Sequence, residues 1–452
     1  MFYNYVFGTA LPKEVQNVSA NLIFCTRIKN FVQARLLRVR RLLSCHILCE
    51  NSSMDSNEKY TIIRLKPKVS SAKILAGFPW VYDNELVLDR RTKKLTSGKV
   101  VELQDSERNF LATAVVNPNS KIFARVLTNT PKRVEESELV LKRINKAKSL
   151  RDSIFKEPYY RLVNSEADQM PGTIIDRFGS FFVIQLNSVW SENNLENITK
   201  VLVQLFNPDG IFKNSNSRAR ALEGLDDRSL IVHGSLPSAP LEVPMNGAIY
   251  MADLNQGQKT GLFYDQRQNH AFLASISKNK TVLDVFSHVG GFALAALAGG
   301  AAEATAIDSS QAALDLAEQG AIVNGFESAF SVIKDDAFNA LKCLRSEEKK
   351  FDIVVCDPPA FAPSKQALSS GLRAYERLAR ISADLVKEGG ILVLCSCSHA
   401  ASLLKFRESC IRGINLAGRN SSIIFTGFAG PDHPVHPMLS ENGYLKSLFL
   451  SL

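Results

Sequence analysis

The sequence predicts an α/β protein in which a parallel sheet covered by helices follows two smaller units. From Val243 onward, buried apolar strands alternate with amphipathic helices, which is typical of a parallel α/β sheet. Upstream, short apolar strands separated by Gly, Pro and Asn turns indicate a β-rich unit, and a charged helix followed by an apolar strand indicates a small α+β unit. We therefore expect four segments, at residues 1–54, 58–130, 131–242 and 243–452.

Length and composition exclude several classes of protein. The chain has 452 residues, enough for two to four domains at about 100–200 residues each. With 45% hydrophobic and 22% charged residues, wholesale disorder and fibrous structure are excluded. The longest uncharged stretches, such as Val285–Ala302, fall short of the ~20 apolar residues that cross a bilayer, so we expect no membrane span. The eight cysteines lack paired CxxC spacing, which predicts reduced thiols and no metal site.

The first 49 residues carry much of the net charge of +9. They hold seven basic side chains and one acid, Glu14. Apolar residues alternate with arginines over Phe31–Leu43, and this Arg-rich, acid-poor composition favours a transit peptide over residues 1–54. We therefore expect an organelle location, in a chloroplast or a mitochondrion, with the cytoplasm as the alternative. A basic RNA-binding arm, or translation that starts at Met54, would explain the same composition.

Three short strands predict the β-rich unit. They span Tyr60–Leu65, Lys99–Leu103 and Phe110–Val116, with turn signals at Gly77–Pro79 and Asn117–Ser120.

The central unit is predicted to begin with a charged helix over Val134–Phe155. After the turn at Asp176–Gly179, the apolar run Phe181–Leu186 predicts a strand, and Ser191–Phe206 predicts a second helix.

A ligand-binding turn is predicted in the segment Thr281–Phe292. Residues 281–286 form a strand, and the pair Gly290-Gly291 lies at the turn into an Ala/Leu-rich helix. Glycines let the backbone approach a ligand closely, and the helix N-terminus offers amide donors. Asp308 ends a second short strand about 20 residues later, where an acid can bind ribose hydroxyls. The G-x-G-x-x-G of dinucleotide enzymes is absent. A packing role for the glycines, with Asp308 as a helix cap, is the alternative.

Three more strands bring polar residues to the same edge of the sheet. Asp335-Asp336 follow a strand at 331–333, and a strand at 351–356 runs into Asp357-Pro358-Pro359, where the proline rings rigidify the loop. A fifth strand, Gly390–Leu394, leads into Cys395–His399. Because open α/β sheets bind ligands outside the carboxyl ends of their strands, these residues should converge on one crevice.

These motifs resemble those of class I S-adenosylmethionine-dependent methyltransferases. They are a D-x-F-x-x-x-G-G-F loop at Asp284–Phe292, an acid after the second strand, a D-P-P-x-F loop at Asp357–Phe361 and an S-C-S turn at Ser396–Ser398. More narrowly, the chain resembles bacterial large-subunit ribosomal RNA cytosine-C5 methyltransferases with an N-terminal PUA domain. The resemblance implies a Rossmann-like methyltransferase domain at 243–452, a PUA-like RNA-binding domain at 58–130 and a small α+β central domain between them.

The resemblance runs from about Tyr60 to Leu452. Phe78 and His288 depart from it, since they stand where the family usually has His and Tyr. The matching segments are Phe78–Val81, Asp168–Gly179, Lys259–Arg267 and Asp432–Val435.

The resemblance also implies S-adenosylmethionine as cofactor and RNA, specifically ribosomal RNA, as partner. It leaves a homodimer open. The implied catalytic residues are Cys397, as the nucleophile that adds to carbon-6 of cytosine, and Asp357, as the acid that hydrogen-bonds the base. We read Cys395 and Cys356 as apolar strand residues. The implied cofactor-binding residues are Asp284, Phe286, Gly290, Gly291, Phe292, Asp308, Asp335, Asp336, Asp265 and Arg267.

Other interpretations stay open at this point. Cys397 could be a buried structural cysteine, and Asp265 and Arg267 could form a salt-bridged surface turn. Lys66, Lys68, Lys73 and Arg90-Arg91 could contact phosphates or could simply be solvated. An amino-group methyltransferase acting on RNA or protein, or a guanine methyltransferase, would not need Cys397. A silent RNA-binding assembly factor would have a damaged cofactor or D-P-P loop, and both loops are intact here.

Overall fold

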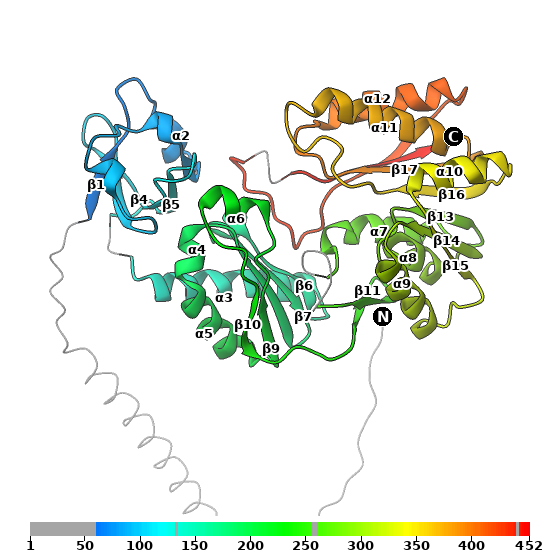
Figure 1. The fold of residues 1–452 in the computed structure, drawn as a ribbon, viewed down its shortest axis with the longest axis horizontal. Helices are drawn as coiled ribbons and strands as arrows, with labels where there is room; N and C mark the ends of the chain where they lie inside the picture. Colours follow the sequence, from blue (N-terminus) through cyan, green and yellow to red (C-terminus); the bar gives the residue numbers. More distant parts are fainter. Residues whose placement is uncertain (1–59, 132–133, 255–260, 440–442) are drawn as a thin grey trace, which may run out of the picture. The chain divides into compact units, whose positions relative to one another are not determined.

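The computed structural model describes residues 60–131, 134–254, 261–439 and 443–452 (Figure 1). The predicted transit peptide at 1–54 lies outside the described residues, as do Lys259 and Thr260 of the Lys259–Arg267 motif. In the described part of the chain, no helix combines the length and the apolar character that a bilayer crossing requires. That part also holds no group of three or more His, Cys, Asp or Glu side chains arranged to bind a metal ion.

The β-rich unit is a five-stranded sheet. Its first strand pairs parallel with the third, and the remaining pairs are antiparallel. Apolar side chains from all these strands fill one core, as the alternating pattern predicts. The strands in sheet order are β1 (Thr61–Arg64), β3 (Val100–Gln104), β4 (Phe110–Val116), β5 (Ala124–Thr128) and β2 (Trp80–Val81), with the short helix α2 (Ala72–Leu75) and 3₁₀ turns η1 (Asp83–Glu85) and η2 (Thr92–Lys94) between them.

The central unit combines a second five-stranded sheet with helices that pack on it. Strands β6, β7 and β8 form an antiparallel meander, and β9 lies parallel to β8. The sheet order is β10 (Leu230–Gly234), β9 (Gly210–Lys213), β8 (Phe181–Leu186), β7 (Thr173–Phe178) and β6 (Tyr159–Asn164); the helices are α3 (Glu136–Ile154), α4 (Val189–Asn193), α5 (Leu195–Phe206) and α6 (Arg218–Glu223), with η3 at Ser165–Asp168.

The stretch predicted as one helix, 191–206, is helical but is divided into α4 and α5 by a break at Asn194. Ser188 caps α4 by accepting a hydrogen bond from the Ser191 N–H at 3.2 Å. At Asn194, between α4 and α5, the side-chain amide donates to the Trp190 carbonyl at 3.0 Å. A short polar side chain that bonds the backbone in this way competes with helix continuation, which explains the break.

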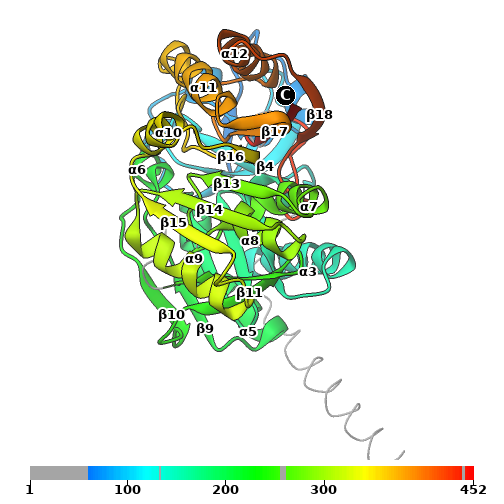
Figure 2. The same ribbon diagram turned by 90° about the vertical axis from the view of Figure 1, so that its right-hand side faces the viewer.

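A hairpin of β11 (Leu241–Met245) and β12 (Ala248–Ala252) leads to η4 (Tyr264–Gln266) and α7 (Arg267–Ser275). The third sheet follows with the predicted parallel strands. Its order is β15 (Phe330–Lys334), β14 (Glu303–Asp308), β13 (Thr281–Val285), β16 (Phe351–Cys356), β17 (Val386–Ser396), β19 (Lys446–Ser451) and β18 (Ser422–Gly427). Figure 2 shows the first five of these side by side.

The strand order reverses between β13 and β16, because the chain first runs outward to β15 and then returns to the other side of β13. Such a switch point opens a crevice at the carboxyl ends of the two central strands. Asp284 lies near the end of β13 and Asp357 directly follows β16, so the two predicted acids lie on either side of this point. The last strand, β19, inserts antiparallel between β17 and β18.

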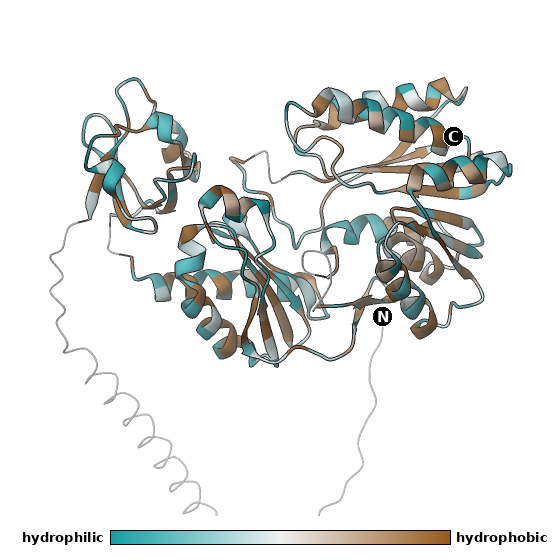
Figure 3. Ribbon diagram, in the orientation of Figure 1, coloured by the Kyte–Doolittle hydropathy of each residue, from teal (hydrophilic) through white to brown (hydrophobic). Residues whose placement is uncertain are grey.

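Helices cover both faces of this sheet. One face packs against α10 (Ala337–Ser346), α11 (Leu368–Ala383) and α12 (Leu403–Leu416), and the other packs against α7, α8 (Gly291–Ala298) and α9 (Gln311–Val323). Neighbouring strand residues divide between the faces, as Val354 and Val355 show. In Figure 3, hydrophobic (brown) and hydrophilic (teal) residues alternate along the ribbons of α11 and α12, as expected for helices with one face in a core.

Candidate active site

The turn after β13 is held by Asp284. Its buried carboxylate accepts hydrogen bonds through Oδ2 from the N–H groups of Phe292 at 3.2 Å and Ala293 at 2.9 Å. The strand end is thereby bonded to the first turn of α8. Between them, Phe286 and His288 have positive φ angles of 63° and 49°. A non-glycine residue adopts a positive φ only where the surrounding contacts impose it, and such residues cluster at ligand sites.

The structure requires a glycine at each of the two positions of the turn for a different reason. Gly290 is left-handed, with φ 76°, and a Cβ there would lie 3.2 Å from the Cβ of Ala317. A Cβ at Gly291 would lie 3.0 Å from the imidazole ring of His270. Burial lowers the pKa of His270 to about 3, so this ring stays neutral. The packing role that the sequence left open for the glycine pair therefore exists, in addition to the access that glycines give to a ligand.

Asp308 braces the same turn from the end of β14. Its Oδ2 accepts the His288 N–H at 2.9 Å, and its Oδ1 accepts the Ser310 N–H at 2.8 Å. Each carboxylate oxygen can accept a further hydrogen bond, so these contacts leave room for ribose hydroxyls. Asp335 and Asp336 follow the next strand and are exposed. Asp336 caps α10 by accepting the Asn339 N–H at 3.1 Å.

The turn fits S-adenosylmethionine. The Oδ1 of Asp284 and the hydroxyl of Ser287 are buried without a hydrogen-bond partner in the described structure. Burial raises the pKa of Asp284 to about 7, against the lowering effect of the two amide hydrogen bonds. A nearby cationic group would favour the ionised carboxylate. A ligand with an ammonium group and ribose hydroxyls thus suits Asp284, Ser287 and Asp308.

Asp357 is positioned by Gln266. The amide nitrogen of Gln266 donates to Oδ2 of Asp357 at 2.8 Å, and its Oε1 accepts a hydrogen bond from Asn269 at 2.5 Å. The backbone N–H of Asp357 donates to the carbonyl of Val285 at 3.2 Å, which bonds the D-P-P loop to β13. Both the backbone and the carboxylate of Asp357 are therefore fixed beside the cofactor turn.

Cys397 lies on the turn after β17 and is half-buried. Its Sγ is 3.9 Å from the carbonyl oxygen of Pro358, so the S-C-S turn touches the D-P-P loop. The Ser398 hydroxyl accepts the Ala362 N–H at 3.0 Å and lies 2.8 Å from the Tyr375 hydroxyl. These contacts join the two loops that the sequence predicted to meet.

The neighbouring cysteines are buried in the sheet. Cys395 lies 3.1 Å from the Ser447 hydroxyl, and Cys356 lies 3.1 Å from the Ser382 hydroxyl. Burial raises the pKa of Cys356 to about 12 and that of Cys395 well above its usual value. Both therefore hold neutral thiols, in agreement with their interpretation as apolar strand residues.

Lys446 was not singled out by the sequence. It is the first residue of β19, pairs with Ser396 across the sheet, and is only 4% exposed. Its ammonium group donates to the carbonyl oxygens of Ser398 at 2.8 Å and Ala401 at 2.7 Å. The available signal was a lysine at the head of an otherwise uncharged strand, but the contact of Lys446 with the Cys397 turn depends on the non-local pairing of β19 with β17.

The comparisons with known proteins agree with this geometry. The profile of the PUA-like domain matches residues 63–129, and that of the S-adenosylmethionine-dependent methyltransferase matches residues 193–412. Ribosomal RNA large subunit methyltransferase I of Aeromonas salmonicida is 34% identical over 379 residues, which cover 83% of this chain and 95% of that protein. The protein of the same name from Escherichia coli O139:H28 is 33% identical over 377 residues, 82% of this chain and 95% of the relative.

The chain belongs to the ribosomal RNA large subunit methyltransferase I family. Solved structures confirm the fold. A methyltransferase from Streptococcus mutans superposes with a TM-score of 0.73 at 21% identity, and another methyltransferase, complexed with SAH, gives 0.74 at 21% identity. Each covers 87% of this chain and 100% of its own. The predicted PUA-like and Rossmann-like methyltransferase folds are therefore confirmed, and S-adenosylmethionine is the cofactor.

Two cofactor-binding residues, Asp265 and Arg267, were predicted within the Lys259–Arg267 motif, and they turn in different directions. Asp265 accepts a 2.6 Å hydrogen bond from the Tyr444 hydroxyl, and the Tyr444 ring lies 5.3 Å from that of His399. Arg267 instead turns to the central unit, where its guanidinium lies 4.2 Å from the centre of the Phe155 ring. A direct cofactor contact for either residue stays a prediction.

Two other family motifs meet in a buried network. Arg151 makes a bidentate ion pair with Asp168, with both N–O distances 2.7 Å. The same guanidinium donates to the Asp432 carbonyl at 3.0 Å, while the Asp432 carboxylate accepts the backbone N–H of Arg161 at 3.1 Å. These motifs therefore join the central unit to the segment before β19.

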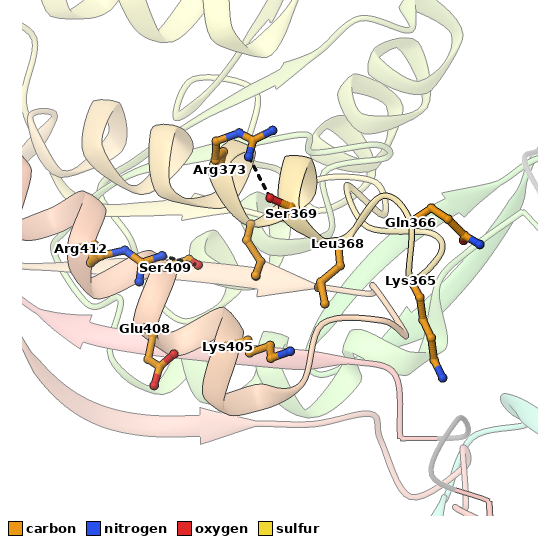
Figure 4. A pocket seen from close by; sticks show the side chains of 10 residues that line it. Lys365, Gln366, Leu368, Ser369, Arg373, Lys405, Glu408, Ser409 and Arg412 are labelled. Atoms are coloured by element: carbon orange, nitrogen blue, oxygen red, sulfur yellow. Dashed lines mark hydrogen bonds between the residues drawn. The ribbon is translucent and has the colours of Figure 1, made fainter.

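A pocket of about 510 Å³ opens between the start of α11 and α12 (Figure 4). Four cationic side chains line it, against the single carboxylate of Glu408. Arg373 donates a hydrogen bond to the Ser369 hydroxyl at 2.8 Å, and the Arg412 guanidinium lies 3.1 Å from the half-buried carboxylate of Glu376. The cations are Lys365, Arg373, Lys405 and Arg412.

Proposed function

We propose that this methyltransferase forms 5-methylcytosine in large-subunit ribosomal RNA, with Cys397 as nucleophile and Asp357 as the residue that binds the base. The contact of the Cys397 turn with the D-P-P loop carries the proposal, because it places a thiol and a carboxylate beside one cofactor turn. The RNA class is supported by the names of the relatives and by the PUA-like domain.

Carbon-5 of cytosine is a poor nucleophile until a group adds to carbon-6. The Cys397 thiolate forms a bond to carbon-6, and the electron pair moves toward carbon-5. S-Adenosylmethionine supplies an electrophilic methyl group on its sulfonium when bound. Carbon-5 takes this methyl group, and the electron pair of the broken bond stays with the departing thioether, S-adenosylhomocysteine. Carbon-5 then loses its proton to water or another base, and the bond between carbon-6 and the Cys397 sulfur breaks to restore the ring and release the thiolate.

Asp357 has the chemistry to hold the cytosine during this reaction. Its carboxyl group can hydrogen-bond the ring nitrogen and exocyclic amine, which offsets the charge that develops on the base. Gln266 occupies one side of the carboxylate at 2.8 Å, so the rest of the group keeps a defined direction. We assign Gln266 as a positioning residue, since it donates a hydrogen bond to Asp357 and accepts one from Asn269.

The basic pocket offers a path for the RNA backbone. Lys365 follows the D-P-P loop along the chain, and Lys405 follows the Cys397 turn, so the pocket is lined by the continuations of both catalytic loops. Lysine and arginine side chains neutralise phosphates without reading sequence. We propose that phosphates next to the target cytosine bind here.

Methylation of isolated RNA tests the proposed product. Large-subunit ribosomal RNA that lacks the modification should acquire a single bisulfite-resistant cytosine when it is incubated with the protein and S-adenosylmethionine. A methyl group found on an exocyclic amine or on guanine would favour the amino-group alternative. Cofactor binding with no transfer to any RNA would favour the assembly factor.

The location of the protein stays a separate proposal. We infer organelle import from the Arg-rich, acid-poor composition of residues 1–54. A reporter fused behind this segment should enter a chloroplast or mitochondrion, and the same fusion with its arginines replaced by glutamines should stay outside. A cytosolic unmodified fusion would reject the transit peptide and leave the enzymatic proposal untouched.

A further inference from the structure

We propose that Lys446 positions the Cys397 turn and supplies the positive charge that favours the Cys397 thiolate. This inference rests on the proposed role of Cys397 as nucleophile. It concerns a residue that no sequence motif identified, and it assigns a task to the C-terminal strand of the methyltransferase sheet.

The first support is the bonding of the ammonium group. Lys446 donates to the carbonyl oxygens of Ser398 and Ala401, at 2.8 and 2.7 Å, and these residues lie on the turn that begins with Cys397. The backbone of Lys446 is itself fixed, because it pairs with Ser396 in the β17–β19 ladder. The side chain therefore braces the turn from the neighbouring strand.

The second support is that the charged ammonium group of Lys446 is buried. Lys446 is 4% exposed, and none of the carboxylates in the described residues forms an ion pair with it. An ammonium has three N–H donors, and the two carbonyls account for two of them. Burial lowers the pKa of Lys446 to about 8, whereas the interaction with Cys397 raises it. By reciprocity, a protonated Lys446 favours the thiolate of Cys397.

The other charged groups around the turn do not replace Lys446. Asp357 and Asp265 are carboxyl groups, and a negative charge near a thiol opposes its ionisation. The Tyr444 hydroxyl donates a hydrogen bond to Asp265, and burial raises the pKa of this tyrosine well above its usual value. Arg161 is held by Asp176 in a bidentate pair at 2.8 and 3.0 Å.

His399 is the remaining titratable neighbour on the turn itself. It is exposed, and its ring lies 5.3 Å from that of Tyr444. The charge of a solvent-exposed side chain is screened by water and salt. Lys446, which is buried and bonded to the turn, therefore has the stronger effect at neutral pH.

The test measures the pH dependence of Cys397 alkylation by iodoacetamide, peptide by peptide, in the whole protein. Only the thiolate reacts, so the midpoint reports its pKa. In the unmodified protein, the midpoint for Cys397 should lie below the ~8.5 of a free cysteine. In Lys446→Gln it should rise by about one unit or more, which makes alkylation at pH 7 roughly tenfold slower. Exposed Cys343, whose thiol donates to Glu347, serves in the same sample as an internal reference for the alkylation reaction, and not for the pKa of a free cysteine.

Lys387→Gln is the matched control. Lys387 lies on β17, near the opposite end of the strand from Cys397, and pairs with Asp352 at 2.9 Å. This variant should leave the Cys397 midpoint unchanged. Lys446→Arg, which keeps the charge, should keep a lower midpoint than Lys446→Gln. Calorimetry with S-adenosylmethionine checks that each variant is folded.

Two results would overturn the inference. One is a Cys397 midpoint at or above that of a free cysteine in the unmodified protein, which needs no variant. The other is a midpoint that Lys446→Gln leaves unchanged, which would reduce Lys446 to a purely structural brace. The assay uses no RNA, so it is independent of the proposed product. A lysine-dependent midpoint together with methylation of an amino group would reject the cytosine-C5 reaction while retaining the pairing of Lys446 with Cys397.

Discussion

Gln266 donates a 2.8 Å hydrogen bond to the carboxylate of Asp357 and so joins the segment before α7 to the D-P-P loop. The two residues are 91 positions apart, and Asn269 fixes the other end of the Gln266 amide. The direction of the Asp357 carboxylate is thus set by the element that precedes the cofactor turn, and not by the D-P-P loop alone.

Loss of this hydrogen bond should slow methyl transfer without loss of cofactor binding. In Gln266→Ala, the carboxylate keeps its place but not its direction, and a hydrogen bond worth about 0.5–1.5 kcal/mol is removed. We expect a roughly two- to tenfold lower single-turnover rate on RNA. Gln311→Ala, which removes an exposed contact with Asp315 on α9, is the control. Equal rates in both variants would show that Gln266 does not orient Asp357.

A second prediction concerns cofactor binding at the turn after β13. Asp308→Ala should weaken S-adenosylmethionine binding by ~1–3 kcal/mol, or roughly tenfold to a hundredfold, because it removes ribose contacts and frees the His288 amide. Gly291→Val should also prevent binding, since the new side chain meets His270. Isothermal calorimetry measures both, with Asp315→Ala on the exposed side of α9 as the control. Unchanged affinity in both Asp308→Ala and Gly291→Val would place the cofactor elsewhere.

From the burial of Asp284 we expect the stability of the protein to depend on pH. Burial raises the pKa of its carboxyl group to about 7, above the usual 3.8, so the folded state holds the proton more tightly than the unfolded state. The stabilising contribution of the Asp284 carboxyl group to the free energy of unfolding is therefore fully present below pH ~4 and is lost as the pH rises through ~7. In Asp284→Asn, the free energy of unfolding should fall less between pH 4 and 7 than in the unmodified protein. Urea titrations at a series of pH values give the free energy of unfolding of each protein. The same pH dependence in Asp284→Asn and in the unmodified protein would contradict the raised pKa of Asp284.

The positions of the reacting groups were predictable because they follow strands. Asp284, Asp308, Asp357 and Cys397 lie at or just after the ends of strands whose apolar runs are plain in the sequence, and parallel strands bring their carboxyl ends to one edge. The break at Asn194 was missed because it depends on the side-chain amide bonding back to the chain.

The residues around the reacting groups were harder to predict. Lys446 reaches the Cys397 turn only because β19 inserts between β17 and β18, a pairing that apolar patterning does not specify. Gln266 and Arg267 are adjacent in sequence, yet one contacts Asp357 and the other packs on Phe155. The direction of α7 and the packing of the central unit decide which of these side chains points to the site. A local sequence motif contains neither.

The basic pocket predicts a salt-dependent effect on RNA binding. Lys365→Glu and Lys405→Glu should each weaken RNA binding and lower the slope of affinity against salt concentration by about one, since each lysine neutralises one phosphate. Affinity for S-adenosylmethionine should not change. Lys342→Glu, an exposed position on α10, provides a control with the same change of charge. Fluorescence anisotropy with target RNA at several salt concentrations measures the slopes, and equal slopes for all three variants would exclude the pocket from RNA binding.

The central claim is that Cys397 adds to carbon-6 of the target cytosine, and trapping with 5-fluorocytidine RNA tests it most directly. Fluorine cannot leave carbon-5 as a proton, so the unmodified protein should accumulate a covalent complex that survives denaturing electrophoresis. Cys397→Ala should form no complex and transfer no methyl group. Cys395→Ala should retain both, because this buried thiol lies two residues earlier on β17, about 6–7 Å away along the strand. Full methyl transfer by Cys397→Ala, with the product on an exocyclic amine, would contradict the account.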